Sequence, residues 1–148
     1  MKITIDEKNK QKEIEVVIKG SKDDQRVQTI YQTLLYYEQS IVGKLDDRYH
    51  QIPLNHIYYF DTTDNRTFAY TSQHVYEVNY RLYQLEEKLE HDPFLRVNKH
   101  SILNLRKIKH FHSTMNGRMD AKLINGERIQ ISRRYVPDLK EKLGGVKS

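Results

Sequence analysis

Alternating hydrophobic and polar positions predict a short unit of two strands and one helix at the start of the chain. Residues 2–6 and 13–18 alternate apolar and polar side chains, which is typical of half-buried strands. A helical pattern follows, and Ser21 with Asp24 resembles a capping box in front of it. The apolar stripe of this helix consists of Val27, Ile30, Tyr31, Leu34 and Leu35. Residues 1–39 are therefore expected to form a small β-β-α unit that packs on the rest of the chain or on a second subunit.

From residue 40 to residue 148 the pattern changes to short apolar runs separated by turn residues. Such spacing favours antiparallel strands, arranged as a sandwich or a barrel, over parallel βαβ units. The runs predicted as strands are 41–45, 49–53, 57–61, 67–71, 75–78, 94–97, 108–113, 119–124 and 128–131. Helical spacing predicts helices over 79–90 and 133–143, and a turn is expected over 99–102. The predicted fold class is α+β and mainly β, with 1–39 and 40–148 as its two parts.

Composition restricts the class of protein. A chain of 148 residues can hold one ordinary domain with a small appendage, and eleven Tyr and four Phe supply large side chains for its core. The absence of Cys excludes disulfides and thiolate metal sites. Neither a signal-peptide segment nor an apolar run of membrane-spanning length is visible. These features predict a soluble, cytoplasmic protein.

The charge is distributed unevenly along the chain. Residues 94–148 contain 13 Lys and Arg against 4 Asp and Glu, a net charge of +9, whereas residues 45–93 contain 4 against 9, a net charge of −5. The overall charge of +5 therefore conceals a strongly basic final third. Dense positive charge attracts polyanions and releases their counterions on contact, so nucleic acid is the first partner to test.

Two polar segments within this basic third are candidate contacts. Ser132, Arg133 and Arg134 stand where a strand ends and a helix begins, and the unpaired N–H groups of a helix start favour a phosphate. The segment 96–101 contains cations, a histidine and short hydrogen-bonding side chains, the types that contact phosphates and base edges. Solvated polar turns are the alternative interpretation of both segments.

Other motifs support different chemistry only weakly. His110 and His112 would lie on one face of a strand, but no third residue at metal-ligand spacing accompanies them. Tyr58-Tyr59-Phe60 and Tyr36-Tyr37 could stack on unpaired bases, although packing within a core or an interface explains them as well. No phosphate-binding glycine loop and no nucleophile with a neighbouring base is visible. Neither catalysis nor a cofactor is expected.

Several motifs in fixed order resemble those of a known family. They are Ile57-Tyr58-Tyr59-Phe60 followed by an acidic residue, the run from Phe94 to Asn104, Ile108, Gly117, Asn125-Gly126, and Ile131-Ser132-Arg133-Arg134-Tyr135. Over residues 41–143 the chain resembles the LytTR DNA-binding domain of bacterial transcription regulators. The resemblance implies an elongated, mainly antiparallel β fold with short helices. Such a domain presents loops and turns to successive major grooves of DNA and commonly recognises direct repeats upstream of operons.

The resemblance also transfers DNA contacts to positions of this sequence. It places base contacts in the loop after Phe60 and in the turn before Ser101, and it places backbone contacts at a hairpin tip. The C-terminal base-reading position falls on Arg134. The full set of implied DNA-binding residues is Asn65, Arg66, Thr67, Asn98, Lys99, His100, Ser101, Asn116, Arg118, Ser132, Arg133 and Arg134.

The partners expected from the sequence follow from this resemblance. Residues 1–39 are too short for a phosphoaccepting receiver, so the chain looks like the short members of the family, some of which are controlled by a membrane protein encoded alongside them. Homodimerisation through the N-terminal unit is a second expectation. The function predicted is a sequence-specific, double-stranded DNA-binding transcription regulator without catalytic activity. The alternatives are a single-strand nucleic-acid-binding β module and a protein-interaction module.

Overall fold

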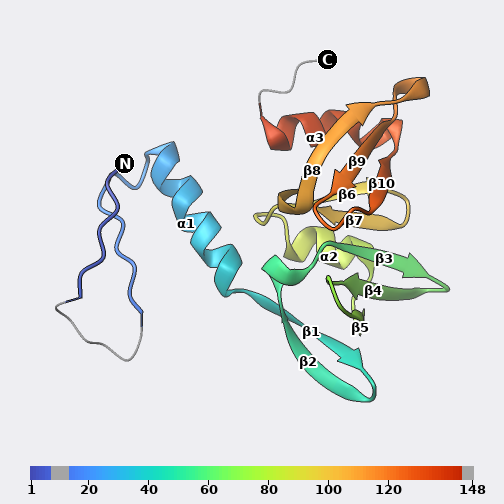
Figure 1. Ribbon diagram of the computed structural model, residues 1–148, viewed down its shortest axis with the longest axis horizontal. Helices are drawn as coiled ribbons and strands as arrows, with labels where there is room; N and C mark the ends of the chain where they lie inside the picture. The colour runs from blue at the N-terminus through green and yellow to red at the C-terminus, as the bar shows by residue number, and fades with distance from the viewer. Residues whose placement is uncertain (8–13, 145–148) are drawn as a thin grey trace.

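Two antiparallel sheets form the main body of the protein (Figure 1). The computed structural model describes residues 1–7 and 14–144. The larger sheet has the order β2-β1-β5-β4-β3-β7-β6 and consists of β1 (Ser40–Leu45), β2 (Arg48–Pro53), β3 (Tyr59–Thr63), β4 (Arg66–Tyr70), β5 (Val75–Val78), β6 (Phe94–Asn98) and β7 (Ser101–Asn104). The smaller sheet has the order β10-β9-β8 and consists of β8 (Ile108–Ser113), β9 (Met119–Leu123) and β10 (Arg128–Ile131). Each predicted strand from residue 41 onward overlaps an observed strand, and the mainly β fold class is confirmed.

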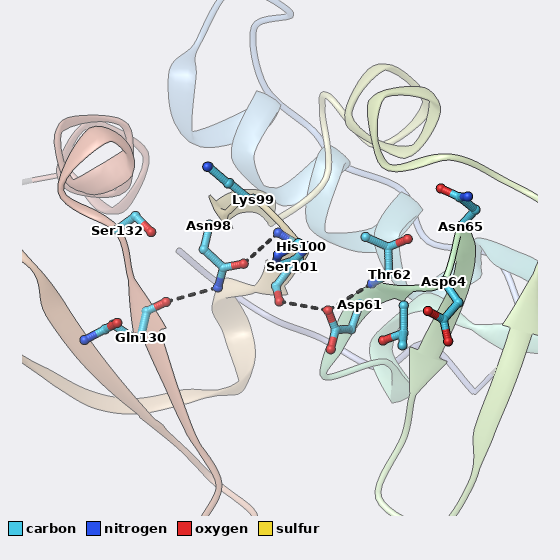
Figure 2. Close-up of a pocket in the computed structure, with 11 residues that line it drawn as sticks. Asp61, Thr62, Asp64, Asn65, Asn98, Lys99, His100, Ser101, Gln130 and Ser132 are labelled. Atoms are coloured by element: carbon cyan, nitrogen blue, oxygen red, sulfur yellow. Dashed lines mark hydrogen bonds between the residues drawn. The ribbon is translucent and has the colours of Figure 1, made fainter.

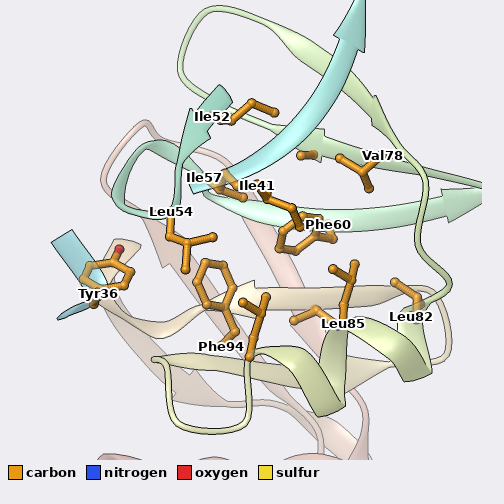
Figure 3. Packing of buried hydrophobic residues seen from close by; sticks show 13 residues of the cluster. Tyr36, Ile41, Ile52, Leu54, Ile57, Phe60, Val78, Leu82, Leu85 and Phe94 are labelled. Atoms are coloured by element: carbon orange, nitrogen blue, oxygen red, sulfur yellow. The ribbon is translucent and has the colours of Figure 1, made fainter. Parts of the chain in front are cut away.

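Two hydrophobic cores lie on opposite faces of β3 and β7. Phe60 and Ile102 point into the first core, which α2 (Leu82–Lys88) covers, and the ring centroids of Phe60 and Phe94 are 5.6 Å apart (Figure 3). Leu103 belongs to the second core, which β9, β10 and α3 (Val136–Leu143) complete. The strands between the two cores are therefore fixed from both sides.

The turn predicted over residues 99–102 is present but shorter, because only Lys99 and His100 connect β6 to β7; the strand β7, which begins at Ser101, was not predicted. All four residues of β7 are buried. A strand covered on both faces shows no alternation of apolar and polar positions, so its period is hidden in the sequence.

The N-terminal unit differs from the expectation. The described parts of the two predicted strands, 2–6 and 14–18, form no strand, and residue 13 lies outside the described residues. Helix α1 (Gln25–Glu38) is present, but Asp24 caps it by accepting a bond of 2.9 Å from the backbone N–H of Arg26, so Ser21 is not the cap. The described parts of these two segments pair neither with each other nor with the large sheet. Without a partner they gain no ladder of hydrogen bonds, and a strand is not formed.

Helix α1 joins the main body only at its end. Tyr36 is buried in the first core, whereas the predicted stripe upstream is exposed or half-buried, with Tyr31 51% exposed. The Nδ2 amide of Asn104 donates to the Tyr36 hydroxyl at 2.8 Å, and Arg106 donates to the Thr33 hydroxyl at 2.9 Å. The last turn of α1 is thus part of the core that positions β7.

Short turns orient the ends of the strands. Asp64 and Asn65 connect β3 to β4 with φ values of 52° and 61°, as the type I′ turn of a two-residue hairpin requires. Asn125-Gly126 lies in the β9–β10 hairpin, as its sequence predicts. Four 3₁₀ turns in the described residues also serve as connections: η1 (Leu54–His56), η2 (Leu105–Lys107), η3 (Met115–Gly117) and η4 (Arg133–Tyr135). Among the described residues, no helix is long and apolar enough to cross a membrane.

Candidate nucleic-acid interface

Three segments that are distant in the sequence converge on one open groove of about 900 Å³ (Figure 2). They are the β3–β4 turn, the β6–β7 turn and the end of β10. The groove is lined by Asp61, Thr62, Thr63, Asp64, Asn65, Asn98, Lys99, His100, Ser101, Gln130 and Ser132. Every one of these side chains carries a hydrogen-bonding group, which is the chemistry needed to contact base edges and phosphates.

In the β3–β4 segment, Asp61 fixes the wall of the groove and Asn65 stands free at its rim. Asp61 Oδ1 accepts bonds from the Thr62 N–H at 2.9 Å and from the Ser101 hydroxyl at 3.4 Å. The Ser101 side chain is therefore directed into the protein, and the residue is only 9% exposed. Asn65 is exposed at the tip of the hairpin, where its amide is accessible.

In the β6–β7 segment, Asn98 fixes the turn and presents Lys99 and His100. Asn98 Oδ1 accepts a bond of 2.9 Å from the His100 N–H, and its Nδ2 donates to the Gln130 carbonyl at 3.2 Å. The amide therefore joins this turn to β10. Lys99 and His100 are exposed beside the groove.

Arg96 is a groove-supporting residue that the sequence does not identify as such. Its Nε donates to the Asn98 carbonyl at 2.9 Å and its Nη2 to the Lys99 carbonyl at 2.6 Å. Nη1 lies 3.4 Å from a carboxylate oxygen of Glu86 on α2. The arginine thus holds two consecutive carbonyls where β6 ends and the turn begins.

Two predicted residues of the β4 strand, Arg66 and Thr67, do not line the groove. The guanidinium of Arg66 forms a bidentate pair with Glu77 at 2.9 and 2.6 Å and lies 5.5 Å from the Phe68 ring centroid. This pair lowers the pKa of Glu77 and raises that of Arg66, because each charge stabilises the other. Thr67 is only 5% exposed, so its side chain does not reach the surface.

The C-terminal candidates form a second surface next to the groove. Ser132 lines the groove, and its N–H donates to the Val97 carbonyl at 2.8 Å. Gly117 adopts φ 74° on η3, and a Cβ there would lie 2.8 Å from Arg133 Cδ, so the 116–118 turn packs against Arg133. Arg134 is exposed, with its guanidinium 5.5 Å from the Tyr135 ring centroid.

The structure therefore divides the predicted residues into groups. The groove brings together Asn65, Asn98, Lys99, His100, Ser101 and Ser132. Arg133 and the exposed residues Asn116 and Arg118 lie together on a neighbouring turn. Within residues 1–7 and 14–144, no cluster of three His, Cys, Asp or Glu side chains could hold a metal ion. The groove therefore offers hydrogen-bonding side chains, and its lining combines the Lys99 cation with the carboxylates of Asp61 and Asp64.

Comparison with known proteins places this region in a defined family. Residues 47–144 match the LytTr DNA-binding domain. Transcriptional regulatory protein LytR of Staphylococcus aureus strain N315 is 27% identical over 125 residues, which cover 84% of this chain and 51% of that protein. Sensory transduction protein LytT of Enterococcus faecalis is 30% identical over 99 residues, covering 67% and 41%. The chain spans about half the length of these curated relatives.

A shorter relative matches nearly end to end. An uncharacterised HTH-type transcriptional regulator of Staphylococcus aureus strain MSSA476 is 28% identical over 145 residues, which cover 97% of this chain and 98% of that protein. A solved LytTr DNA-binding domain from Bacillus cereus superimposes with a TM-score of 0.68 and 24% identity, covering 72% of this chain and 97% of that domain. At that identity the superposition establishes the fold.

Proposed function

The chain belongs to the LytTr DNA-binding domain family, and from this premise we propose that it regulates transcription by binding specific double-stranded DNA sites. The observation that carries the proposal is the convergence of two turns and the end of β10, with their hydrogen-bonding side chains, on one groove. Turns inserted into a major groove can reach the donor and acceptor patterns that distinguish base pairs. The basic final third of the chain supplies the attraction for phosphates.

The geometry supports a division of labour among the side chains. In the proposed complex, the exposed residues Asn65, Lys99, His100 and Arg134 contact base edges. Ser132, Arg133, Asn116 and Arg118 contact the DNA backbone and fix the register. Asn98 and Ser101 hold the contact turn through the protein bonds described above. Arg66 and Thr67 have no direct role here, since one is paired with Glu77 and the other is buried.

Fluorescence anisotropy with duplex DNA from upstream of the protein's own gene tests this function. We expect the protein to bind this upstream duplex roughly a thousandfold more tightly than a scrambled duplex at moderate salt. The slope of log affinity against log salt then counts the phosphates contacted. Equal, weak and steeply salt-dependent binding to both duplexes would contradict specific readout of that site. Tighter binding to the separated strands would favour a single-strand-binding module, and an absence of binding to either form would favour a protein-interaction module.

We also propose that residues 1–39 mediate self-association on DNA. Apolar side chains near the N-terminus are strongly exposed: Ile3 and Ile5 are each 84% exposed and Ile14 is 92% exposed. A second copy of the chain is a suitable cover, because direct repeats would place two copies side by side. Sedimentation velocity of Ile5→Asp should show a smaller assembly than the unmodified chain, whereas unchanged sedimentation would contradict this role.

A further inference from the structure

A second cavity, of about 490 Å³, lies at the end of the β4 strand away from the DNA groove. The groove borders the β3–β4 turn that precedes β4, whereas the second cavity borders residues 71–74 that follow it. Residues of β2, η1 and β5, together with Tyr58 and Lys107, complete its lining. Its volume is within the range of about 300–1,000 Å³ that small-molecule sites occupy.

The lining of this cavity combines aromatic rings with hydrogen-bond donors and contains no carboxylate. His50 and His74 each meet the Tyr76 ring edge to face, with centroids 5.5 and 5.9 Å apart. The buried ring of Tyr58 forms another part of the wall. Rings of this kind provide flat apolar surface while their polar atoms can still hydrogen-bond a ligand.

Lys107 is the unusual group in the lining. Its Nζ lies 5.0 Å from the Tyr58 ring centroid, and within the described residues no carboxylate is at ion-pair distance from it. Burial lowers its pKa, with no opposing contribution. Desolvation also lowers the pKa of Lys142, but this lysine donates to the Phe94 carbonyl at 2.8 Å, and Asp92 and Glu90 oppose the shift. Removing a charge from water is costly unless it is paired. The half-buried Lys107 has the Tyr58 ring beside it but no carboxylate among the described residues, whereas Lys142 has a carbonyl acceptor and nearby carboxylates.

We propose that this cavity binds a small organic anion, with its carboxylate or phosphate paired to Lys107 and its planar body against the aromatic wall. Such a ligand supplies the counterion that the lining does not provide. The proposal is independent of the DNA-binding function, because none of the residues involved lines the DNA groove.

Three probes separate the contribution of the anionic group from that of the planar ring. They are phenyl phosphate, which has both, inorganic phosphate, which has only the anion, and phenol, which has only the ring. Titrated into the full chain and followed by amide NMR shifts, phenyl phosphate should bind one site, and phenol and inorganic phosphate should each bind at least about tenfold more weakly. The shifted amides should include those of Tyr58, Tyr76 and Lys107. Shifts centred instead on Lys99 and His100 would overturn the proposal, since the probe would then be imitating DNA phosphate.

Variants of Lys107 and His74 supply the second test. Lys107→Gln should weaken phenyl phosphate by about tenfold or more, and His74→Gln, on an exposed turn, should weaken it by less. Lys109→Gln is the matched control, because Lys109 is exposed and does not line the cavity. If Lys107→Gln and Lys109→Gln weakened phenyl phosphate binding equally, the binding would reflect the overall positive charge of the protein, and the proposed site would be wrong. If Lys107→Gln lowered duplex DNA affinity and its salt slope, the lysine would be a DNA contact and the proposed ligand site would be wrong.

Discussion

Each end of the β6–β7 hairpin carries an asparagine, and the two asparagines have different roles. Asn104, at the core end, is fully buried and donates from Nδ2 to the Tyr36 hydroxyl and to the Ile57 carbonyl, both at 2.8 Å. Asn98, at the groove end, makes two similar bonds where water has access. Water can replace the partners of Asn98 but not those of Asn104. The core end therefore determines stability, and the groove end determines the shape of the surface.

The largest effect is expected from Asn104→Ala. The substitution leaves the buried Tyr36 hydroxyl and Ile57 carbonyl without their donor, so unfolding free energy should fall by about 2–4 kcal/mol. Urea denaturation measures this loss. Asn98→Ala is the matched control and should cost less than about 1 kcal/mol. Equal losses at both positions would show that the comparison between the two ends is wrong.

Arg134→Ala should have the next largest effect, on DNA affinity alone. An exposed arginine that reads a base edge contributes about 1–3 kcal/mol to specific binding, and its loss relaxes the preference at that base pair. Anisotropy with specific and scrambled duplexes measures both quantities. Unchanged affinity for both duplexes would show that Arg134 does not read a base. A lowered midpoint of urea denaturation would show that Arg134 has a structural role.

Arg96→Gln tests whether DNA binding at the groove end depends on the hydrogen bonds that hold the β6–β7 turn. Loss of the bonds to the Asn98 and Lys99 carbonyls should weaken specific binding by about 1–2 kcal/mol, since the Asn98 amide still closes the turn. The salt slope should stay unchanged, because this guanidinium is directed at protein carbonyls. A slope reduced by about one unit would instead identify Arg96 as a phosphate contact.

The smallest effect is expected from Arg118→Ala. This exposed residue adjoins the η3 turn, where a phosphate contact would position the protein without reading sequence. Affinity for specific and scrambled duplexes should fall alike, and the salt slope should decrease by about one unit. The same titrations measure the slope. Loss confined to the specific duplex would move Arg118 from the backbone contacts to the base contacts.

Local sequence patterns were sufficient to predict most of the β-strands and to identify the family. Apolar runs bounded by turn residues predicted the strands from residue 41 onward, because the side-chain period of a strand is two and turns favour particular residues. It failed at β7, where burial on both faces hides the period. It also failed at residues 2–6, where alternation is present but no neighbouring strand pairs with the segment. A strand needs a partner, and a periodic pattern cannot supply one.

The sequence by itself determined the order of the elements, the basic final third and the motifs of a DNA-binding family. Only the tertiary structure decided which polar side chains are free to bind a partner. Asn98 bonds to Gln130, Ser101 to Asp61 and Asn104 to Tyr36, so each pair joins residues more than thirty positions apart. Local patterns depend on neighbours along the chain, whereas these bonds depend on how the whole chain packs. The same packing buries Thr67 and leaves Lys107 without a nearby carboxylate among the described residues.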